Sequence, residues 1–537
     1  MSRPQETNAS VVKNPAGSDR QGKVAGLAAI VMAAGRGTRM RSKHAKVLHP
    51  VAGQAMVLYS VGLGLRVAGD RVAVVVGHQA DLVRQVIARA AAGQSGASPV
   101  AIVEQGKLLG TGHAVLQSRS AFAVGKRGAP SRYLILNGDT PLLQEKTVRE
   151  LLRVHEAERA AVTILTAMLD DASGYGRVVR AHSAKRSVSR IVEDRDATVE
   201  ERAIREINVG TYVVDGEFLF SALEKLDPCN AQGEYYLTDI IHLAERAGLR
   251  VAAVVLDNPG EGLGVNTRRQ LAEAEQVVRQ QIRDRWLDAG VMMIDPASVW
   301  IDATVTIGKD TVLYPGVTLE GATVIGEDCV LRSHTRLTDC LIGNGVEILD
   351  HSVCADSQIE DDAHVGPFVH LRPGVVVRKR AKVGNFVEMK KTDLGEGSKA
   401  NHLSYLGDAK IGKGVNIGAG TITCNYDGVR KFQTVIGDGV FLGSDTQLIA
   451  PVTVGAGAIV AAGTTVTGDV PADALAIARA PQVNRAGWAA RRRALADPGT
   501  AGVRQEAHGT GQAASPGISR LKPLAGRGGK VKRGGRK

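Results

Sequence analysis

Short apolar runs alternate with amphipathic stretches through residues 26–265. The apolar runs fit buried strands and cover residues 27–32, 72–76, 133–136, 162–167, 211–214 and 251–256. Helical spacing of apolar residues lies between several of them, as at 81–92 and 146–157. Strands that alternate with helices are typical of an α/β domain, so we expect a parallel sheet here.

The next stretch, residues 266–288, predicts one long helix. Asn266 or Thr267 can cap its start, and Gly290 follows its end. One face carries the apolar side chains Leu271, Val278, Ile282 and Trp286. We expect this helix to connect two domains, with the linker at 266–290.

Beyond residue 291 the apolar period changes to six. Aliphatic residues recur without error every six positions from Ile307 to Leu337, from Ile359 to Val383 and from Ile436 to Val466. A helix repeats at 3.6 and a plain strand at 2, whereas a six-residue period indicates a parallel β-helix. The narrow bore of such a fold has no room for large rings, which agrees with the low aromatic content of 4%.

This period breaks twice, between residues 390 and 410 and between residues 422 and 434. Insertions in solenoid folds become loops on one face, often the binding face. The broken stretches contain His402, Tyr405, Asn425 and Tyr426, so we expect chemistry there.

The formal net charge of +12 is concentrated at one end of the chain. Residues 491–537 carry twelve Lys and Arg against two Asp and Glu, a net of +10, which leaves +2 for the other residues. We expect this glycine-rich tail to be disordered. Nucleic-acid binding through the tail is an alternative function, but the tail lacks the interleaved aromatic residues that stack on bases.

Residues 1–25 are polar and predict a disordered extension without a secretory signal. No stretch of 18 apolar residues occurs, so no membrane span is expected. The five cysteines include no C-x-x-C pair, which favours neither a disulfide framework nor a zinc site and indicates a cytoplasmic location.

A glycine-rich turn, residues 32–40, follows the first predicted strand. Its glycines let backbone N–H groups approach phosphates, but it is neither a Walker A loop nor a dinucleotide fingerprint. Lys46 follows shortly and can neutralise a phosphate. Asp139 comes at the end of another predicted strand, where one carboxylate together with substrate phosphates suits Mg²⁺.

Taken together, these motifs carry a family resemblance. Residues 33–40 (AAGRGTRM), 46–49 (KVLH), 109–114 (LGTGHA), 384–391 (GNFVEMKK) and 416–428 (NIGAGTITCNYDG) occur in this order. The chain resembles the bacterial bifunctional N-acetylglucosamine-1-phosphate uridyltransferase/glucosamine-1-phosphate acetyltransferases over residues 26–490. The resemblance implies an α/β Rossmann-like nucleotidyltransferase domain at 26–265 and a left-handed parallel β-helix of hexapeptide repeats at 291–490.

The resemblance also implies the first site and its chemistry. UTP and N-acetylglucosamine 1-phosphate combine there, pyrophosphate leaves, and Mg²⁺ is held by Asp139 and Asn266. The implied contacts to UTP and to the product UDP-N-acetylglucosamine are Met32, Ala33, Ala34, Gly35, Arg39, Lys46, Gln105, Gly110, Thr111, Asn137, Gly138, Asp139, Gly176, Glu193, Asn208 and Asn266. Asn137 departs from the tyrosine that some members carry.

In the second site, the resemblance implies acetyl transfer from acetyl-CoA to glucosamine 1-phosphate. His402 matches the general base, which removes the proton of the amine. The implied contacts to glucosamine 1-phosphate are Arg372, Glu388, Lys390, Tyr405 and Asn416, and those to acetyl-CoA are Ala419, Asn425, Tyr426, Ser444, Ala462 and Arg479. Asn401 replaces the glycine that some members carry beside the base.

Such enzymes supply UDP-N-acetylglucosamine for peptidoglycan and lipopolysaccharide precursors. Their acetyl-CoA site lies between neighbouring subunits, so the resemblance implies a homotrimer. One alternative keeps the nucleotidyl transfer and makes the β-helix purely structural or regulatory. His402 and the two stretches at 384–391 and 416–428 argue against that alternative.

Overall fold

The computed structural model describes residues 22–92, 100–122, 128–181 and 187–496. The chain divides into two compact units, one ending at Arg479 and one beginning at Ala480. Most of the expected N-terminal extension, and the tail beyond residue 496, lie outside the described residues. No helix in the described ranges combines the length and the apolar character needed to cross a membrane.

The first domain is built on a nine-stranded sheet whose main path runs β11-β7-β10-β6-β1-β4-β5. Its strands are β1 (Leu27–Ala33), β4 (Val72–Val76), β5 (Ala101–Glu104), β6 (Arg132–Asn137), β7 (Val162–Met168), β8 (Arg177–Arg180), β9 (Val188–Val192), β10 (Glu206–Asp215) and β11 (Val251–Val255). The six predicted apolar runs are confirmed as strands. The expected parallel sheet is instead mixed, because β10 runs antiparallel to both β6 and β7. A buried strand has the same apolar pattern in either direction, so the sequence does not show its orientation.

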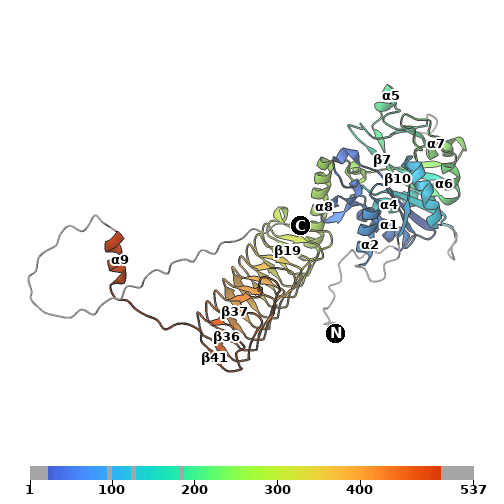
Figure 1. Cartoon of the computed structure of the whole chain (residues 1–537). Helices are drawn as coiled ribbons and strands as arrows, with labels where there is room; N and C mark the ends of the chain where they lie inside the picture. The colour runs from blue at the N-terminus through green and yellow to red at the C-terminus, as the bar shows by residue number, and fades with distance from the viewer. Residues whose placement is uncertain (1–21, 93–99, 123–127, 182–186, 497–537) are drawn as a thin grey trace, which may run out of the picture. The chain divides into compact units, whose positions relative to one another are not determined.

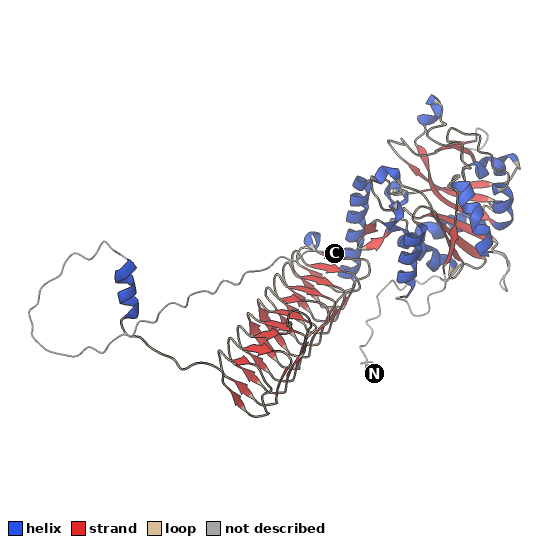
Figure 2. Ribbon diagram, in the orientation of Figure 1, coloured by secondary structure: helices blue, strands red, loops and turns tan. Residues whose placement is uncertain are grey.

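Helices cover both faces of this sheet (Figures 1 and 2). One apolar layer takes side chains from α1 (Met56–Ala68), α2 (Ala80–Ala92) and α4 (Glu145–Ala157). The opposite layer takes them from α3 (Thr111–Gln117), α6 (Gly216–Leu223) and α7 (Asp239–Arg246). The remaining short elements of the domain are α5 (Val199–Arg202), η1 (Thr38–Met40), η2 (Lys46–Leu48), η3 (Ser118–Phe122), η4 (Pro259–Gly262) and the hairpin β2 (Pro50–Val51) and β3 (Gln54–Ala55).

The predicted connecting helix is α8 (Arg268–Asp288). Thr267 is its cap, and it forms a capping box with Gln270. Its buried face consists of Ala274, Val278, Ile282 and Trp286. These side chains belong to the same apolar cluster as the interior of the β-helix, so α8 closes one end of that fold.

The second domain is the expected left-handed parallel β-helix, with three sheets as its sides (Figure 2). The first side consists of β12 (Met292–Met293), β15 (Val312–Leu313), β18 (Val330–Leu331), β21 (Glu347–Ile348), β24 (His364–Val365), β27 (Lys382–Asn385), β30 (Lys399–His402), β33 (Asn416–Ile417), β36 (Phe441–Leu442), β39 (Ile459–Val460) and β41 (Leu475–Ala476). The second side consists of β13 (Trp300–Ile301), β16 (Thr318–Glu320), β19 (Arg336–Thr338), β22 (Val353–Ala355), β25 (His370–Leu371), β28 (Glu388–Lys390), β31 (Tyr405–Gly407), β34 (Ile422–Cys424), β37 (Gln447–Ile449) and β40 (Thr465–Val466). The third side consists of β14 (Thr306–Ile307), β17 (Val324–Ile325), β20 (Leu341–Ile342), β23 (Ser357–Ile359), β26 (Val375–Val377), β29 (Asp393–Leu394), β32 (Ala409–Ile411), β35 (Thr434–Ile436) and β38 (Val452–Val454). The short helix η5 (Pro296–Ser298) lies in the first coil.

The two breaks in the six-residue period have different structural causes. Between residues 390 and 410 no loop leaves the coil, so the expectation of an insertion there is wrong. Two corners are a residue shorter instead. The buried side chains of Met389 and Leu394 stand five residues apart rather than six, and so do those of Leu406 and Ile411. The second break is a true excursion: the chain leaves the coil after β34 and returns at β35, with an antiparallel bridge between Tyr426 and Lys431.

The last paired strand is β41, and residues beyond Arg479 belong to the second unit. In that unit, residues 488–496 form the helix α9 (Trp488–Ala496). Disorder was expected from residue 491, so this expectation is wrong for residues 491–496.

Candidate active sites

A cavity of about 770 Å³ opens at the carboxyl ends of β1 and β6. These strands are parallel neighbours, with Met32 opposite Asn137, so the turns that follow them meet at one edge of the sheet. All residues expected in the first site line this cavity except Gly138. They are Met32, Ala33, Ala34, Gly35, Arg39, Lys46, Gln105, Gly110, Thr111, Asn137, Asp139, Gly176, Glu193, Asn208 and Asn266.

Gly138 instead supports the wall of the cavity. Its N–H donates to the carbonyl of Met32 at 2.9 Å, which ties the turn after β6 to the end of β1. A Cβ at this position would lie 3.0 Å from the same carbonyl oxygen. The close approach of the two strand ends therefore favours glycine there.

Charged and amide groups gather at one end of the cavity. Lys46 forms an ion pair with Asp139, and its Nζ also donates to Oδ1 of Asn266 at 2.9 Å. Arg39 donates to the same Oδ1 at 3.0 Å. The side chains of Lys46 and Asp139 are only 15% and 16% exposed. Two cations beside a carboxylate and an amide oxygen can bind phosphate groups together with a hard metal ion.

A second group of polar side chains surrounds Gln105. Its Nε2 donates to the carbonyl of Gly110 at 3.0 Å and lies 3.2 Å from Nδ1 of His113. Gly110 has φ of 109°, and a Cβ there would lie 2.6 Å from the carbonyl oxygen of Tyr235. Glycine is therefore required where this loop begins α3. Thr111 accepts the N–H of Leu237 at 3.0 Å, which anchors the same loop.

The remaining predicted residues, Gly176, Glu193 and Asn208, come from β8, β9 and β10 or their ends. Burial raises the pKa of Glu193, while a hydrogen bond from Thr238 at 3.2 Å opposes that shift. Asn208 lies 2.6 Å from the hydroxyl of Tyr212. Such half-buried acceptors can bind sugar hydroxyl groups.

Sequence reasoning missed several residues of this cavity. Arg36, Tyr175 and Glu234 also line it. Arg36 and Tyr175 lie inside conspicuous glycine-rich stretches, and this feature of the sequence could have identified them as residues of the site. Glu234 follows Gly233 in the stretch GEYYLTDII, whose position in the fold the sequence alone did not show.

In the β-helix, His402 lies at the corner between the first and second sides. Its Nδ1 lies 2.7 Å from Oδ1 of Asn385, the equivalent residue one coil earlier. The amide oxygen can only accept, so Nδ1 carries the proton and Nε2 is left as a base. Asn385 was not among the predicted site residues, although it lies within the conspicuous stretch GNFVEMKK.

The same corner continues through residues that were expected to contact acetyl-CoA. Ala419, Ser444 and Ala462 occupy the equivalent position in the following coils. The carbonyl of Ala419 accepts the N–H of Asp445 at 2.7 Å, and the carbonyl of Ala462 accepts from Arg479 at 2.6 Å. The structure therefore places these three residues in one column that leads away from His402, and Arg479 contacts the last of them.

The second side carries most of the expected sugar-phosphate residues. Arg372 and Glu388 form an ion pair at 2.8 Å, and Glu388 is the strand neighbour of Tyr405. The neighbouring cations Lys431 and Arg372 lower the pKa of Lys390. Such a cluster of positive charge suits a phosphate.

Three further residues were expected here. Asn425 donates to Asp408 at 2.6 Å at the start of the excursion, and Tyr426 is 58% exposed within it. Asn416 instead begins β33 on the first side, on a different sheet from Tyr405.

Comparison with known proteins gives two family matches. Residues 28–293 match a family described as nucleotidyl transferase, and residues 433–468 match bacterial transferase hexapeptide repeats. The chain is similar to "Bifunctional protein GlmU" of Trichlorobacter lovleyi, with 50% identity over 466 residues, 87% of this chain and 98% of that protein. Proteins of the same name from Halalkalibacterium halodurans and Shouchella clausii are 47% and 45% identical, over 85% and 86% of this chain and 97% and 98% of their own lengths.

Proposed function

Because this chain belongs to the family of bifunctional GlmU proteins, we propose that its two sites act through the residues described above. The chain is an enzyme that makes UDP-N-acetylglucosamine by acetyl transfer followed by uridylyl transfer. Its substrates are sugar phosphates, UTP and acetyl-CoA, and the uridylyl transfer uses a divalent metal.

In the first site, an oxygen of N-acetylglucosamine 1-phosphate attacks the α-phosphorus of UTP. The bond to the β-phosphate breaks, and pyrophosphate leaves. Lys46 and Arg39 lie where they can neutralise the phosphates, which is the main contribution a protein makes to this chemistry. The position of Lys46 between Asp139 and Asn266 is the observation that carries this assignment.

We assign the metal as Mg²⁺, held by Asp139 and Asn266. Among the described residues, no group of three or more His, Cys, Asp or Glu side chains is placed to hold a metal. Mg²⁺ suits such a site because it commonly takes one or two protein oxygens and completes its shell with substrate phosphates and water. When bound, it supplies positive charge to the phosphate oxygens.

In the second site, Nε2 of His402 takes a proton from the amine of glucosamine 1-phosphate. The amine nitrogen attacks the thioester carbonyl, the C–S bond breaks, and the proton passes to the leaving thiolate of CoA. Asn385 holds the imidazole in the tautomer that leaves Nε2 free to accept. Arg372 and Lys390 bind the phosphate, and Ala419, Ser444, Ala462 and Arg479 contact acetyl-CoA.

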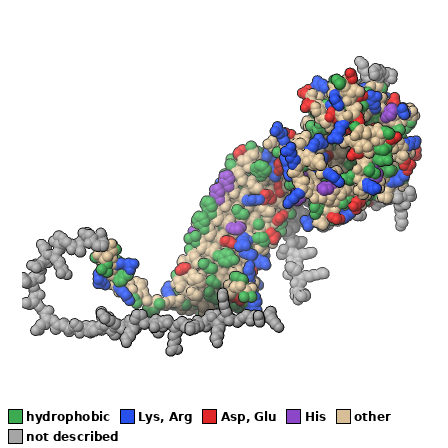
Figure 3. Space-filling view, turned by 45° about the horizontal axis from the view of Figure 1, so that its top comes forward, with side chains coloured by type: hydrophobic (Ala, Val, Ile, Leu, Met, Phe, Trp, Pro, Cys, Tyr) green, Lys and Arg blue, Asp and Glu red, His purple; other side chains and the backbone are tan. Residues whose placement is uncertain are grey.

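A homotrimer in the cytoplasm completes the proposal. The rings of His334, His351, Phe368 and Phe386 stack along one corner of the β-helix with centroids 5.1 to 5.4 Å apart. Figure 3 shows hydrophobic and histidine side chains along the surface of this domain. Exposed apolar rings suit burial against another copy. Sedimentation equilibrium should give three chains per particle, and a monomer would contradict the assembly.

The deciding experiment incubates the purified protein with glucosamine 1-phosphate, acetyl-CoA, UTP and Mg²⁺ and separates the products. UDP-N-acetylglucosamine should form only when all components are present. Its formation from N-acetylglucosamine 1-phosphate, but not from the amine and acetyl-CoA, would instead support a structural β-helix and remove the role of His402.

A further inference from the structure

The hairpin β2–β3 of the first domain packs against the beginning of the β-helix. Val51, Ala52 and Met56 are fully buried in the apolar cluster of the β-helix, together with Trp286 of α8. The apolar layer that α1, α2 and α4 form against the sheet of the first domain does not include these three residues. A short segment of the nucleotidyltransferase domain is thus part of the interior of the second domain.

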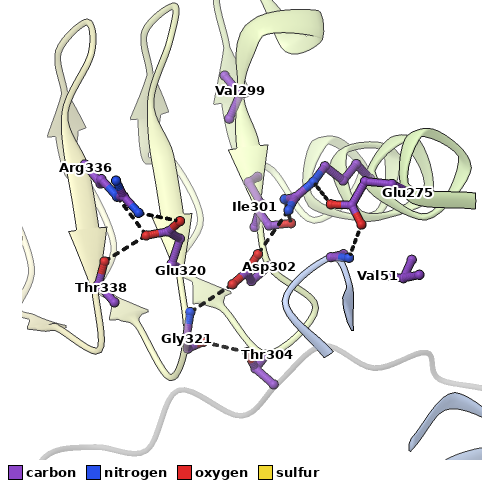
Figure 4. A network of polar contacts seen from close by, with 12 residues as sticks. Val51, Glu275, Val299, Ile301, Asp302, Thr304, Glu320, Gly321, Arg336 and Thr338 are labelled. Atoms are coloured by element: carbon purple, nitrogen blue, oxygen red, sulfur yellow. Dashed lines mark hydrogen bonds and ion pairs between the residues drawn. The ribbon is translucent and has the colours of Figure 1, made fainter. Parts of the chain in front are cut away.

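Arg279 of α8 lies at the centre of a polar network beside this hairpin. Figure 4 shows Glu275, Ile301 and Asp302, its three hydrogen-bond partners. Its Nε donates to Glu275 at 2.6 Å, and its other nitrogens donate to the carbonyl of Ile301 at 2.9 Å and to Asp302 at 3.2 Å. The guanidinium stacks over the ring of Trp300, 4.5 Å from its centroid. Arg279 and Asp302 have side chains only 11% exposed, so both charges depend on their partners.

This network holds the tip of the hairpin from two sides. Glu275 accepts the N–H of Ala52 at 2.7 Å, and the carbonyl of Ala52 accepts the N–H of Ala303 at 2.9 Å. Gly53 has φ of 74°, and a Cβ there would lie 2.2 Å from a carboxylate oxygen of Asp302. The hairpin therefore packs so closely against the first coil that position 53 has no room for a side chain.

Two residues at the charged end of the first cavity adjoin this network along the chain: Lys46, which pairs with Asp139, and Asn266, which accepts a hydrogen bond from Lys46. Lys46 begins η2, which leads through His49 directly into β2. Asn266 immediately precedes Thr267, the cap of α8, the helix that carries Glu275 and Arg279. A shift of the hairpin relative to α8 would therefore move Lys46 relative to Asn266.

We propose that Arg279, Glu275 and Asp302 form a positioning unit for uridylyl transfer, through which the first coil of the β-helix sets the relative placement of Lys46 and Asn266. No residue of the unit lines the first cavity. The inference rests on the proposed assignment of uridylyl transfer to that cavity. It makes the first coil a required part of the nucleotidyltransferase, independent of acetyl transfer.

The test uses Arg279→Met and the near-isosteric Glu275→Gln in the full-length protein. Arg336→Met is the matched control, because it breaks the 2.8 Å ion pair to Glu320 one coil further along without touching the hairpin (Figure 4). Both activities are measured on each preparation, together with the Mg²⁺ concentration that gives half-maximal uridylyl transfer.

Arg279→Met should lower kcat/KM for uridylyl transfer about 10- to 100-fold, as small misplacements of catalytic groups do. It should also raise the half-maximal Mg²⁺ concentration, while acetyl transfer stays at the parent rate. Glu275→Gln should shift both quantities in the same direction, and Arg336→Met should shift neither. Parent-like uridylyl kinetics and Mg²⁺ dependence in Arg279→Met, or an equal loss of both activities, would overturn the inference. Absence of uridylyl transfer from the parent protein would instead refute the proposed function.

Discussion

Lys46 and Asp139 form an ion pair in the first cavity although 93 residues separate them in the chain. The parallel pairing of β1 with β6 brings the two segments together, since each residue follows one of these strands. Lys46 also reaches Asn266, so one ammonium group connects three distant parts of the sequence. Asp139 and Asn266 hold this cation at the end of the cavity where we propose that phosphates bind.

Lys46→Met should therefore reduce uridylyl transfer strongly. Loss of one preorganised charge at a transferring phosphate typically costs about 10²- to 10³-fold in kcat. Pyrophosphate release from UTP and N-acetylglucosamine 1-phosphate measures this effect. Acetyl transfer by the same preparation serves as the control, and it should be unchanged because His402 lies in the other domain. A variant with full uridylyl activity would exclude Lys46 from the reaction.

Much of this fold could be predicted from periodicity. The apolar runs predicted six of the nine strands of the first sheet, and the six-residue repeat predicted the β-helix. The direction of β10 could not be predicted, because burial imposes the same pattern on parallel and antiparallel strands. The break near residue 400 was misinterpreted, since shortening a corner and inserting a loop both disturb the period.

The sites were predictable to different degrees. Residues next to strand ends, such as Asp139, follow from sheet geometry. Asn385, the hydrogen-bond partner of His402, could not be predicted in this way. It lies 17 residues earlier and meets His402 only because successive coils stack on one another. The number of residues in each coil therefore determines which side chains become neighbours. Shortened corners change that number, so the neighbours could not be read from the sequence.

Asn385 should control the working tautomer of His402. Asn385→Leu removes the acceptor for Nδ1–H, so we expect acetyl transfer to fall about 10- to 100-fold while uridylyl transfer is unchanged. Asn385→Asp places a carboxylate there, which stabilises the protonated imidazolium. The neutral base then forms only at higher pH, and the acidic limb of the kcat profile should move upward. Profiles that coincide with that of the parent protein would remove Asn385 from the mechanism.

Glu193→Gln should stabilise the fold while weakening the first site. Burial raises the pKa of Glu193 above its ordinary value of 4.5, so ionisation costs the folded state more than the unfolded chain. That cost is absent at low pH and grows as pH rises through the raised pKa. The variant should thus have a higher Tm than the parent near about pH 7.5, and the difference should vanish near about pH 4. Its KM for N-acetylglucosamine 1-phosphate should rise, because an amide is a poorer acceptor for sugar hydroxyl groups. Equal Tm values at the higher pH would contradict this account.

His155 should make the first domain less stable in mild acid. The side chain is 4% exposed and lies 3.0 Å from the hydroxyl of Thr163. Burial, and then the nearby Arg132, lower its pKa from 6.5 to about 4, while Asp215 opposes the shift. Between these two values the unfolded chain binds a proton that the folded chain does not, so the free energy of unfolding falls as pH decreases. The full difference amounts to about 3 kcal/mol. Urea unfolding at several pH values should show this loss in the parent protein. The double variant His155→Leu, Thr163→Val removes both polar partners, so its free energy of unfolding should lack this loss in mild acid. If the free energies of unfolding of the two proteins instead changed in parallel with pH, His155 would contribute nothing to acid sensitivity.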